Sequence, residues 1–434
     1  MNRNTIISNR AVEGRDLGLY IHIPFCARKC DYCDFLSAPA SQNTMEQYFH
    51  AMLEEIGQYQ GNTGDYIVPT IFFGGGTPSF VDASYIEEIM ELFNQVFRID
   101  HKRLEATMEM NPGTVMKEKL LTYKKAGINR ISFGLQSADN KELSLLGRIH
   151  TYEQFEDNYK LARQLGFDNI NIDLMSALPG QTLSSWENTL NKVIELNPEH
   201  ISAYSLIIEE GTKFYDRYQE NAVGAKELPD EETDRLIYHK TKEILLENGY
   251  HRYEISNYAK PGFECRHNSS YWIGTDYLGI GLGASSLLDG TRFSNISDIA
   301  QYMNKCNEYR SNPNRSGCDG MDKTSAMYNR INNSIWQQDI TLEDVIGIRT
   351  GQEKLTKQDR MEEFMFLGLR MCDGISRKNF YQRFGTQIDS IYGEEIKRLE
   401  KDNLIWQQGD MIRLTDYGID ISNYVFSMFL RSDQ

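Results

Sequence analysis

Short apolar runs alternate with longer amphipathic runs between residues 17 and 206, and this alternation restricts the fold more than any other feature. Six apolar runs predict strands, at residues 17–23, 67–73, 104–110, 131–133, 170–174 and 201–206. Helical spacing occupies the stretches between them, at residues 45–59, 85–97, 117–126, 152–165 and 183–196. Repeated strand–helix units favour a parallel sheet with helices outside. The sequence therefore predicts an α/β fold, a partial TIM-like (β/α) barrel.

The rest of the chain divides by composition. Residues 1–16 form an N-terminal segment, 17–240 the barrel core, and 241–309 a region that completes this core. Residues 310–353 are rich in Asn, Ser, Gly and Asp, which predicts a polar insertion or linker. Residues 354–434 begin with an amphipathic helix and continue as helix, strand, turn at Gln408 and Gly409, strand, helix. This order predicts a mainly helical, winged-helix-like C-terminal domain.

Composition and charge narrow the function classes. The net charge of the 434 residues is -16, and no basic stripe interrupts it, so we expect no nucleic-acid partner, even for the winged-helix-like domain. No apolar run approaches the roughly 20 residues of a membrane span, and the first residues lack the apolar core of a signal peptide. Seven cysteines in a chain of this length do not resemble a secreted disulfide framework. We expect a cytoplasmic protein with reduced thiols.

Three of the cysteines, Cys26, Cys30 and Cys33, lie within the stretch "YIHIPFCARKCDYCDF", directly after the first predicted strand. Structural zinc sites take four ligands, and no second ligand pair follows at the usual distance. Chance clustering of buried thiols is disfavoured because charged residues surround them. Iron–sulfur clusters are held by thiolates, and four is the usual number for a four-iron cluster. Three thiolates would leave one iron with an open position for a small molecule.

Glycines and polar residues follow the other predicted strands. The second strand ends in "FFGGGTPS", where missing Cβ atoms let the backbone approach a ligand closely, although a tight turn is the simpler interpretation. Single polar residues at strand ends are often solvated, but several at successive strand ends would meet in a barrel. An arginine among them suits a carboxylate through its forked donors. The candidates are Gly75, Gly76, Thr77, Glu109, Gln136, Arg148 and Asp173.

The cysteine spacing, with Tyr32 before the last cysteine, resembles the signature of radical S-adenosylmethionine (radical SAM) enzymes. The resemblance implies that Cys26, Cys30 and Cys33 bind a four-iron, four-sulfur (4Fe-4S) cluster as metal ligands. In that superfamily the open iron holds S-adenosylmethionine, and an electron from the cluster cleaves it. The glycine motif resembles the one that binds the methionine amino group.

The motifs "LYIHIPFC", "INRISFGLQS" and "LPGQT" resemble the oxygen-independent coproporphyrinogen III oxidase branch of this superfamily over nearly the whole chain, including a HemN-like C-terminal domain. The resemblance implies S-adenosylmethionine contacts at matching positions. These are Tyr20, Tyr32, Gly75, Gly76, Thr77, Glu109, Gln136, Arg148 and Asp173.

One departure separates the chain from true oxidases. They carry another cysteine two residues after the third, where this chain has Phe35. Only 19 residues precede Tyr20, which leaves little room for the oxidases' N-terminal extension. Both features resemble the HemW-type haem chaperones. This resemblance implies that the chain binds the cluster, S-adenosylmethionine and haem. It also implies that the chain delivers haem to acceptor proteins such as respiratory enzymes. Membrane association is expected only through such partners. The alternative is radical oxidative decarboxylation by a coproporphyrinogen III oxidase.

The segment "CRHNSSYW" matches the H-N-x-x-Y-W motif that these chaperones use for haem. The resemblance implies that His267, Asn268, Tyr271 and Trp272 contact haem, because imidazole ligates iron and aromatic rings cover a porphyrin. The residues alone leave open a buried histidine beside core aromatics. Ser285 stands where relatives often have histidine, so no second histidine ligand is predicted. No catalytic residue is assigned.

Overall fold

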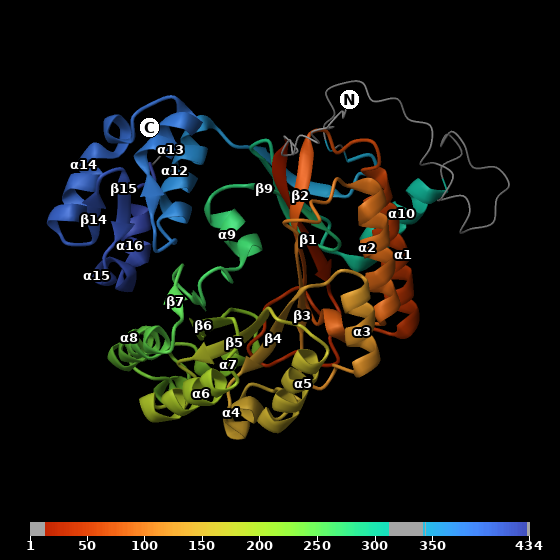
Figure 1. Cartoon of the computed structure of the whole chain (residues 1–434), viewed down its shortest axis with the longest axis horizontal. Coiled ribbons are helices and arrows are strands. Elements are labelled where there is room, and N and C mark those ends of the chain that lie inside the picture. The colour runs from red at the N-terminus through yellow and green to blue at the C-terminus, as the bar shows by residue number, and fades with distance from the viewer. Residues whose placement is uncertain (1–13, 312–341, 343, 432–434) are drawn as a thin grey trace, which may run out of the picture.

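The computed structural model describes residues 14–311, 342 and 344–431 (Figure 1). Among these residues, twelve strands form one large sheet and three form a small one. Six neighbouring strands of the large sheet are parallel and follow the order of the chain. They are β1 (Arg15–Ile23), β2 (Tyr66–Gly75), β3 (Glu105–Met110), β4 (Arg130–Gln136), β5 (Ile170–Ser176) and β6 (His200–Ser205).

Helices connect these strands and cover the outer face of the curved sheet (Figure 1). They are α1 (Gln42–Gln58), α2 (Ala83–Val96), α3 (Lys117–Lys125), α4 (Asn140–Leu145), α5 (Tyr152–Gln164) and α6 (Leu183–Glu195). The predicted strands and helices are all present, with bounds displaced by a few residues. Capping explains several starts: Thr151 and Thr182 each form a capping box at the first turn of the following helix. The α/β prediction is confirmed.

The barrel is partial, as predicted, because its two edges do not meet. At one edge β6 pairs with the antiparallel strand β8 (Asn257–Ala259), which pairs with β7 (His251–Arg252). At the other edge β1 pairs in parallel with β9 (Asp276–Ile280). An antiparallel hairpin, β10 (Ser285–Leu288) and β11 (Thr291–Asn295), extends that edge. Strands β1 to β6 are buried on both faces, which accounts for their continuous apolar runs.

The range 310–353, expected as an insertion or linker, lies mostly outside the described residues. Its described end departs from the expectation. Residues Arg349–Lys354 form β12, which pairs antiparallel with β11 and becomes the outermost strand of the sheet. Ile348, just before it, is fully buried in the barrel core. Strand β12 was not predicted from the sequence because its residues are polar, and an edge strand needs few apolar side chains.

The C-terminal domain has its own apolar core. Its small sheet has the order β13-β15-β14, from β13 (Ile375–Ser376), β14 (Ile405–Gln408) and β15 (Met411–Leu414). The hairpin β14–β15 follows a helix and precedes another, as predicted. The surrounding helices are α12 (Lys357–Gly368), α13 (Arg377–Phe384), α14 (Ile388–Lys401), α15 (Asp416–Asp420) and α16 (Ser422–Ser427).

Three further helices matter for the sites below. Helices α7 (Lys213–Tyr218) and α8 (Glu231–Glu247) follow β6, and α9 (Arg266–Trp272) lies inside the curve of the sheet, between the sheet and the C-terminal domain (Figure 1). Helix α10 (Ile299–Arg310) packs against α1. No helix in the described ranges combines the length and apolar character that crossing a membrane requires.

Candidate functional site

A cavity of about 490 Å³ lies at the carboxyl ends of the parallel strands, and we call it the mouth cavity. Strand β1 ends at Ile23, and the loop with the three cysteines follows directly. The cavity collects nearly all of the predicted cluster and S-adenosylmethionine residues from separate strands and loops. Its lining includes Cys26, Cys30, Tyr32, Cys33, Gly75, Gly76, Thr77, Glu109, Gln136, Arg148, Asp173 and Asn268.

Contacts from three directions fix the cysteine loop. The hydroxyl of Thr77 donates to the sulfur of Cys26 at 3.5 Å, and a guanidinium nitrogen of Arg148 lies 3.5 Å from the sulfur of Cys30. Between the cysteines, the buried carboxylate of Asp31 accepts from Lys213 at 3.0 Å and pairs with Arg217 at 3.1 Å. Both cations belong to α7. These contacts give the cysteine loop a defined shape.

The glycine motif packs against this loop. A Cβ atom at Gly76 would lie 2.7 Å from the carbonyl oxygen of Phe25 and 3.0 Å from the sulfur of Cys26. Gly75 has a φ of 108°, in the left-handed region that favours glycine, and a Cβ there would lie 2.6 Å from the ring of His22. Both positions therefore require glycine, because the second strand and the cysteine loop touch through them.

Glu109 lines the mouth cavity with a partly buried side chain. It accepts the backbone N–H of Gly75 at 3.2 Å. Burial, together with the neighbouring Asp173 carboxylate, raises the pKa of Glu109 to about 8. Tyr20, predicted beside it, does not line the cavity: its ring stacks on Phe72 and its hydroxyl lies 3.1 Å from Nδ1 of His22.

Arg148 has donors left for a ligand. It contacts Cys30, donates to the Asn111 side chain at 3.1 Å and also donates to the carbonyl oxygen of Gly134. Its Nε is buried and lacks a hydrogen-bond partner among the described residues. An unpaired buried N–H costs free energy unless a bound group satisfies it. The guanidinium is thus suited to an anionic group inside the cavity.

Asp173 and Gln136 are held by side chains of β4, β5 and β6. The carboxylate of Asp173 accepts from Asn171 at 2.7 Å and from Ser132 at 3.0 Å, and burial raises its pKa. Gln136 has a φ of 74°, a strained conformation for a residue other than glycine. Its side-chain oxygen accepts from the hydroxyl of Tyr204 at 3.0 Å.

Three residues that line this cavity, Asn111, Ser132 and Tyr204, are not among the site residues predicted from the sequence. Asn111 follows the end of β3, and Tyr204 lies near the end of β6. Both positions are at strand ends, where side chains of a parallel sheet converge. They were not predicted because asparagine and tyrosine are common in loops and do not by themselves indicate a binding site. Ser132 lies in the middle of a strand and carried no signal.

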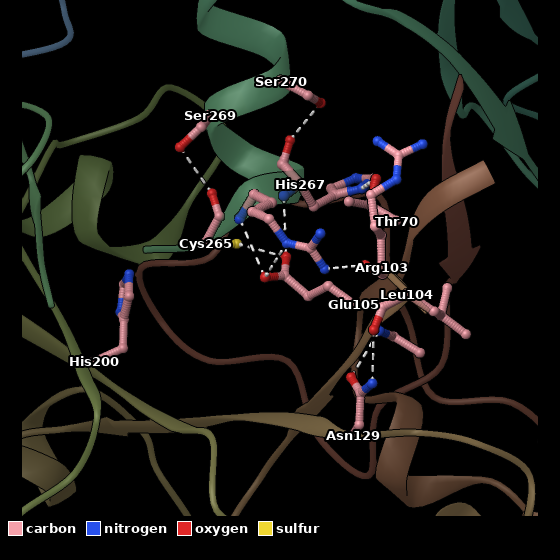
Figure 2. A network of polar contacts seen from close by, with 12 residues as sticks. Thr70, Arg103, Leu104, Glu105, Asn129, His200, Cys265, His267, Ser269 and Ser270 are labelled. Carbon is pink, nitrogen blue, oxygen red and sulfur yellow. Dashed lines mark hydrogen bonds and ion pairs between the residues drawn. The ribbon is translucent and has the colours of Figure 1, made fainter. Parts of the chain in front are cut away.

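The H-N-x-x-Y-W segment forms α9 and lies in the interior (Figure 1). The carboxylate of Glu105 accepts the backbone N–H groups of Arg266 and His267, at 3.2 and 3.0 Å, and so caps the first turn of α9 (Figure 2). At the other end, Arg383 donates to the carbonyl oxygens of Ile273 and Gly274. Opposite charges from two distant elements therefore hold the ends of this short helix.

His267 uses both ring nitrogens inside the protein. Nδ1 lies 3.0 Å from the Thr70 hydroxyl and Nε2 lies 2.8 Å from the hydroxyl of Tyr271. The ring is buried against Phe72, and burial lowers its pKa to about 3. In this conformation neither nitrogen is free to ligate iron. The geometry therefore favours the alternative that the residues left open, a buried histidine beside core aromatics.

The remaining residues of this motif divide between two places. Asn268 lines the mouth cavity, and Tyr271 packs edge-on against His267 and Tyr277. Trp272 lies beneath the guanidinium of Arg370, 4.3 Å from the ring centre. Arg370 therefore covers one face of Trp272, while Trp272 also lines a cavity of about 210 Å³.

The donors in the mouth cavity fit the groups that the sequence implied. No three or more His, Cys, Asp or Glu side chains in the described ranges converge on a single metal ion. A four-iron cluster has no such requirement, because each thiolate binds a different iron. Three sulfurs on one loop, a glycine backbone beside them and an unpaired guanidinium N–H match a cluster with an amino-acid ligand next to it.

Comparisons with known proteins place the chain in a family. Residues 20–193 match the radical SAM superfamily and residues 355–421 match the HemN C-terminal domain. The protein named haem chaperone HemW from Bacillus subtilis is 34% identical over 95% of this chain and 98% of its own length. Its namesake from Escherichia coli is 40% identical over 62% of this chain and 69% of its own length.

Among solved structures, Escherichia coli HemN, described as a coproporphyrinogen III oxidase and radical SAM enzyme, matches with a TM-score of 0.77. The match covers 97% of this chain and 91% of that one at 23% identity, and it shows that the fold is shared. The chain therefore belongs to the radical SAM superfamily and, within it, to the family of proteins named haem chaperone HemW.

Proposed function

We propose that this protein is a haem chaperone that binds a 4Fe-4S cluster, S-adenosylmethionine and haem, and delivers haem to acceptor proteins. One observation carries the proposal: the three thiols and the polar strand ends line one cavity in a chain of the HemW family. Respiratory haem enzymes are the acceptors we propose. The protein would work in the cytoplasm, reach membranes only through those partners, and bind no nucleic acid.

The mouth cavity supplies a specific role for each group. Cys26, Cys30 and Cys33 would hold the cluster, which supplies one-electron chemistry and an open iron when bound. The Glu109 carboxyl, whose ionised form a bound cation would favour, and the carbonyl oxygen of Gly75 would accept from the ammonium group of S-adenosylmethionine.

Two further groups would complete the S-adenosylmethionine site. The unpaired Nε of Arg148 supports a contact with the methionine carboxylate. Asp173 would accept from the ribose hydroxyls, because Asn171 and Ser132 hold its carboxylate in place. Gln136 and Tyr32, which also line the cavity, would contact the rest of the molecule.

Phe35 bears on the oxidase alternative. Its side chain is 61% exposed at the position where true oxidases have their additional cysteine, and it lines the mouth cavity. A phenylalanine offers an apolar face there and no thiol. Incubation of the reconstituted protein with coproporphyrinogen III should therefore yield no protoporphyrinogen, and formation of that product would replace the chaperone proposal by the oxidase.

A haem-transfer assay tests the proposal. Anaerobically reconstituted protein, loaded with haem, is mixed with an apo-haemoprotein, and activity of the acceptor is followed. We expect transfer from the wild-type chain. Cys30→Ala should lose the cluster absorption, because one of three thiolates is gone, and Cys306→Ala, at a free cysteine that does not line the mouth cavity, is the matched control that keeps it. A wild-type chain that binds no haem, or Cys30→Ala with unchanged iron content, would contradict the proposal.

A further inference from the structure

Helix α7 contacts the cysteine loop between its second and third cysteines, at Asp31. The side chains of Lys213 and Arg217 pair with the Asp31 carboxylate at 3.0 and 3.1 Å. The carbonyl oxygen of Asp31 also accepts the backbone N–H of Phe214 at 3.0 Å. Asp31 is buried, whereas the two cationic side chains are exposed. One helix therefore binds both the side chain and the backbone of a buried carboxylate residue in this loop.

A second segment binds Asp31 through its backbone and lies close to its carboxylate. The N–H of Asp31 donates to the carbonyl oxygen of Leu146 at 3.1 Å. Gly147 has a φ of 75°, and a Cβ atom there would lie 3.0 Å from the Asp31 carboxylate. Arg148, the next residue, contacts the sulfur of Cys30. Asp31 therefore joins α7 to the segment that carries Arg148.

Apolar packing supports the same contact. The ring of Tyr32, the residue before Cys33, meets the ring of Phe214 edge-on, with the ring centres 6.2 Å apart. Both rings belong to a small apolar cluster with Leu146 and Tyr218, which is separate from the barrel core. Ion pairs, a backbone hydrogen bond and apolar contacts therefore all join the middle of the cysteine loop to α7.

Helix α7 lies beyond the segment that matches the radical SAM superfamily, because that match ends at residue 193. The connection from β6 to α7 also forms part of the mouth cavity, which Leu206, Ile207 and Glu209 line. The contact at Asp31 therefore ties the cysteine loop to a part of the chain that follows the superfamily segment.

Asp31 is adjacent to Cys30 but does not itself line the mouth cavity. It can therefore act on a bound group through the shape of the cysteine loop and through its charge. Outer groups that hold the ligands of a metal site tune how the site binds its metal. A negative charge near a cluster disfavours the uptake of an electron, and positive charges favour it.

We propose that Asp31 is a positioning residue for the 4Fe-4S cluster, and that α7 holds it through Lys213 and Arg217. The carboxylate fixes the spacing of the Cys30 and Cys33 thiols in the cluster-free chain, and the two cations balance its charge beside the cluster. The inference rests on the proposed function, because the cluster is part of that proposal.

Hydrogen–deuterium exchange of the cluster-free chain tests the positioning role without any bound group. Asp31→Asn keeps the size of the side chain and removes its charge. Exchange in peptides that cover residues 26–36 and 212–218 should become about fivefold faster, because two charge-assisted bonds weaken. Asp216→Asn removes an exposed carboxylate from the same helix, and this control should leave both peptides unchanged. Unchanged exchange in Asp31→Asn would overturn the positioning role.

The reduction potential of the reconstituted cluster separates the effect of charge from that of shape. A mediated electrochemical titration, followed by electron paramagnetic resonance, measures it. Asp31→Asn should shift the potential to more positive values, and Lys213→Gln/Arg217→Gln should shift it to more negative values. Lys213→Arg keeps the charge and should keep the wild-type potential. A purely structural role predicts no such opposition, so shifts of one sign in both charge-removing variants would overturn the balance of charges.

The outcomes separate this inference from the proposed function. If the wild-type chain takes up no cluster on anaerobic reconstitution, both fail. If it takes up the cluster, and Asp31→Asn matches it in exchange and in potential, Asp31 does not position the cluster and the proposed function stands. Circular dichroism shows whether each variant is folded. Should Asp31→Asn not fold, Lys213→Gln/Arg217→Gln carries both tests, because its side chains are exposed.

Discussion

The mouth cavity can be compared with a second cavity of about 270 Å³, the joint cavity, which lies where the barrel meets the C-terminal domain. Both are lined by arginines and both contain cysteine sulfur, yet they are built differently. The mouth cavity takes its groups from the ends of successive parallel strands within one domain. The joint cavity takes its groups from two domains, with a bridge of backbone hydrogen bonds between them. The residues of a site at the ends of parallel strands can be predicted from the sequence, because each of them follows an apolar run. The residues of a site between two domains cannot be predicted in this way, because they come together only when the domains pack.

The largest expected effect concerns α9, which lies between the cavities. Glu105→Gln should lower the free energy of unfolding by about 3 kcal/mol, because the buried carboxylate caps α9 and lies near the buried Arg130. Urea unfolding measures this. Glu46→Gln, on the exposed face of α1, is the control and should change little. Equal stability of Glu105→Gln and the wild type would mean that α9 is held by packing alone.

Arg148→Gln should weaken ligand binding in the mouth cavity. We expect S-adenosylmethionine binding to weaken by about 2 kcal/mol, because a charged donor facing the ligand carboxylate is lost. Calorimetric titration measures this. Arg98→Gln, which removes an exposed arginine that does not line the cavity, is the control. Equal affinity of Arg148→Gln and the wild type would contradict the carboxylate contact.

The pH dependence of stability tests the burial of Glu109. In the folded chain its carboxyl stays protonated up to about pH 8, whereas in the unfolded chain it ionises near its ordinary value of 4.5. The unfolded state therefore binds fewer protons between these values, and the contribution of Glu109 to stability falls as pH rises through that window. Glu109→Gln should lose less stability than the wild type between about pH 5 and about pH 8 in urea unfolding. Parallel curves would contradict the raised pKa.

The sequence was sufficient for the six parallel strands and for most of the mouth cavity. Apolar runs buried on both faces leave a continuous signal, and polar residues directly after them converge because all parallel strands end on one side. Gly76 shows the same logic: a position where Cβ would meet the Cys26 sulfur accepts only glycine. The cysteine loop itself was recognisable because its three thiols lie close together in sequence.

The environment of His267 was beyond sequence reasoning. Its backbone N–H donates to Glu105, which is 162 positions away in the chain, and its ring contacts Thr70 on another strand. A histidine in an aromatic motif has the same appearance whether it faces solvent or the interior. The joint cavity was missed for the same reason, because Arg370, Arg413 and Lys242 are ordinary surface residue types until the domains are packed together.

Helix α9 has a consequence for communication across the molecule. Asn268 at one turn forms part of the wall around the cluster loop, and Trp272 at the next supports Arg370, while Arg383 fastens the helix end to the C-terminal domain. Helix α9 thus connects the wall of the mouth cavity to the C-terminal domain within a few residues. A displacement of the C-terminal domain relative to the barrel would therefore strain contacts at both ends of this seven-residue helix.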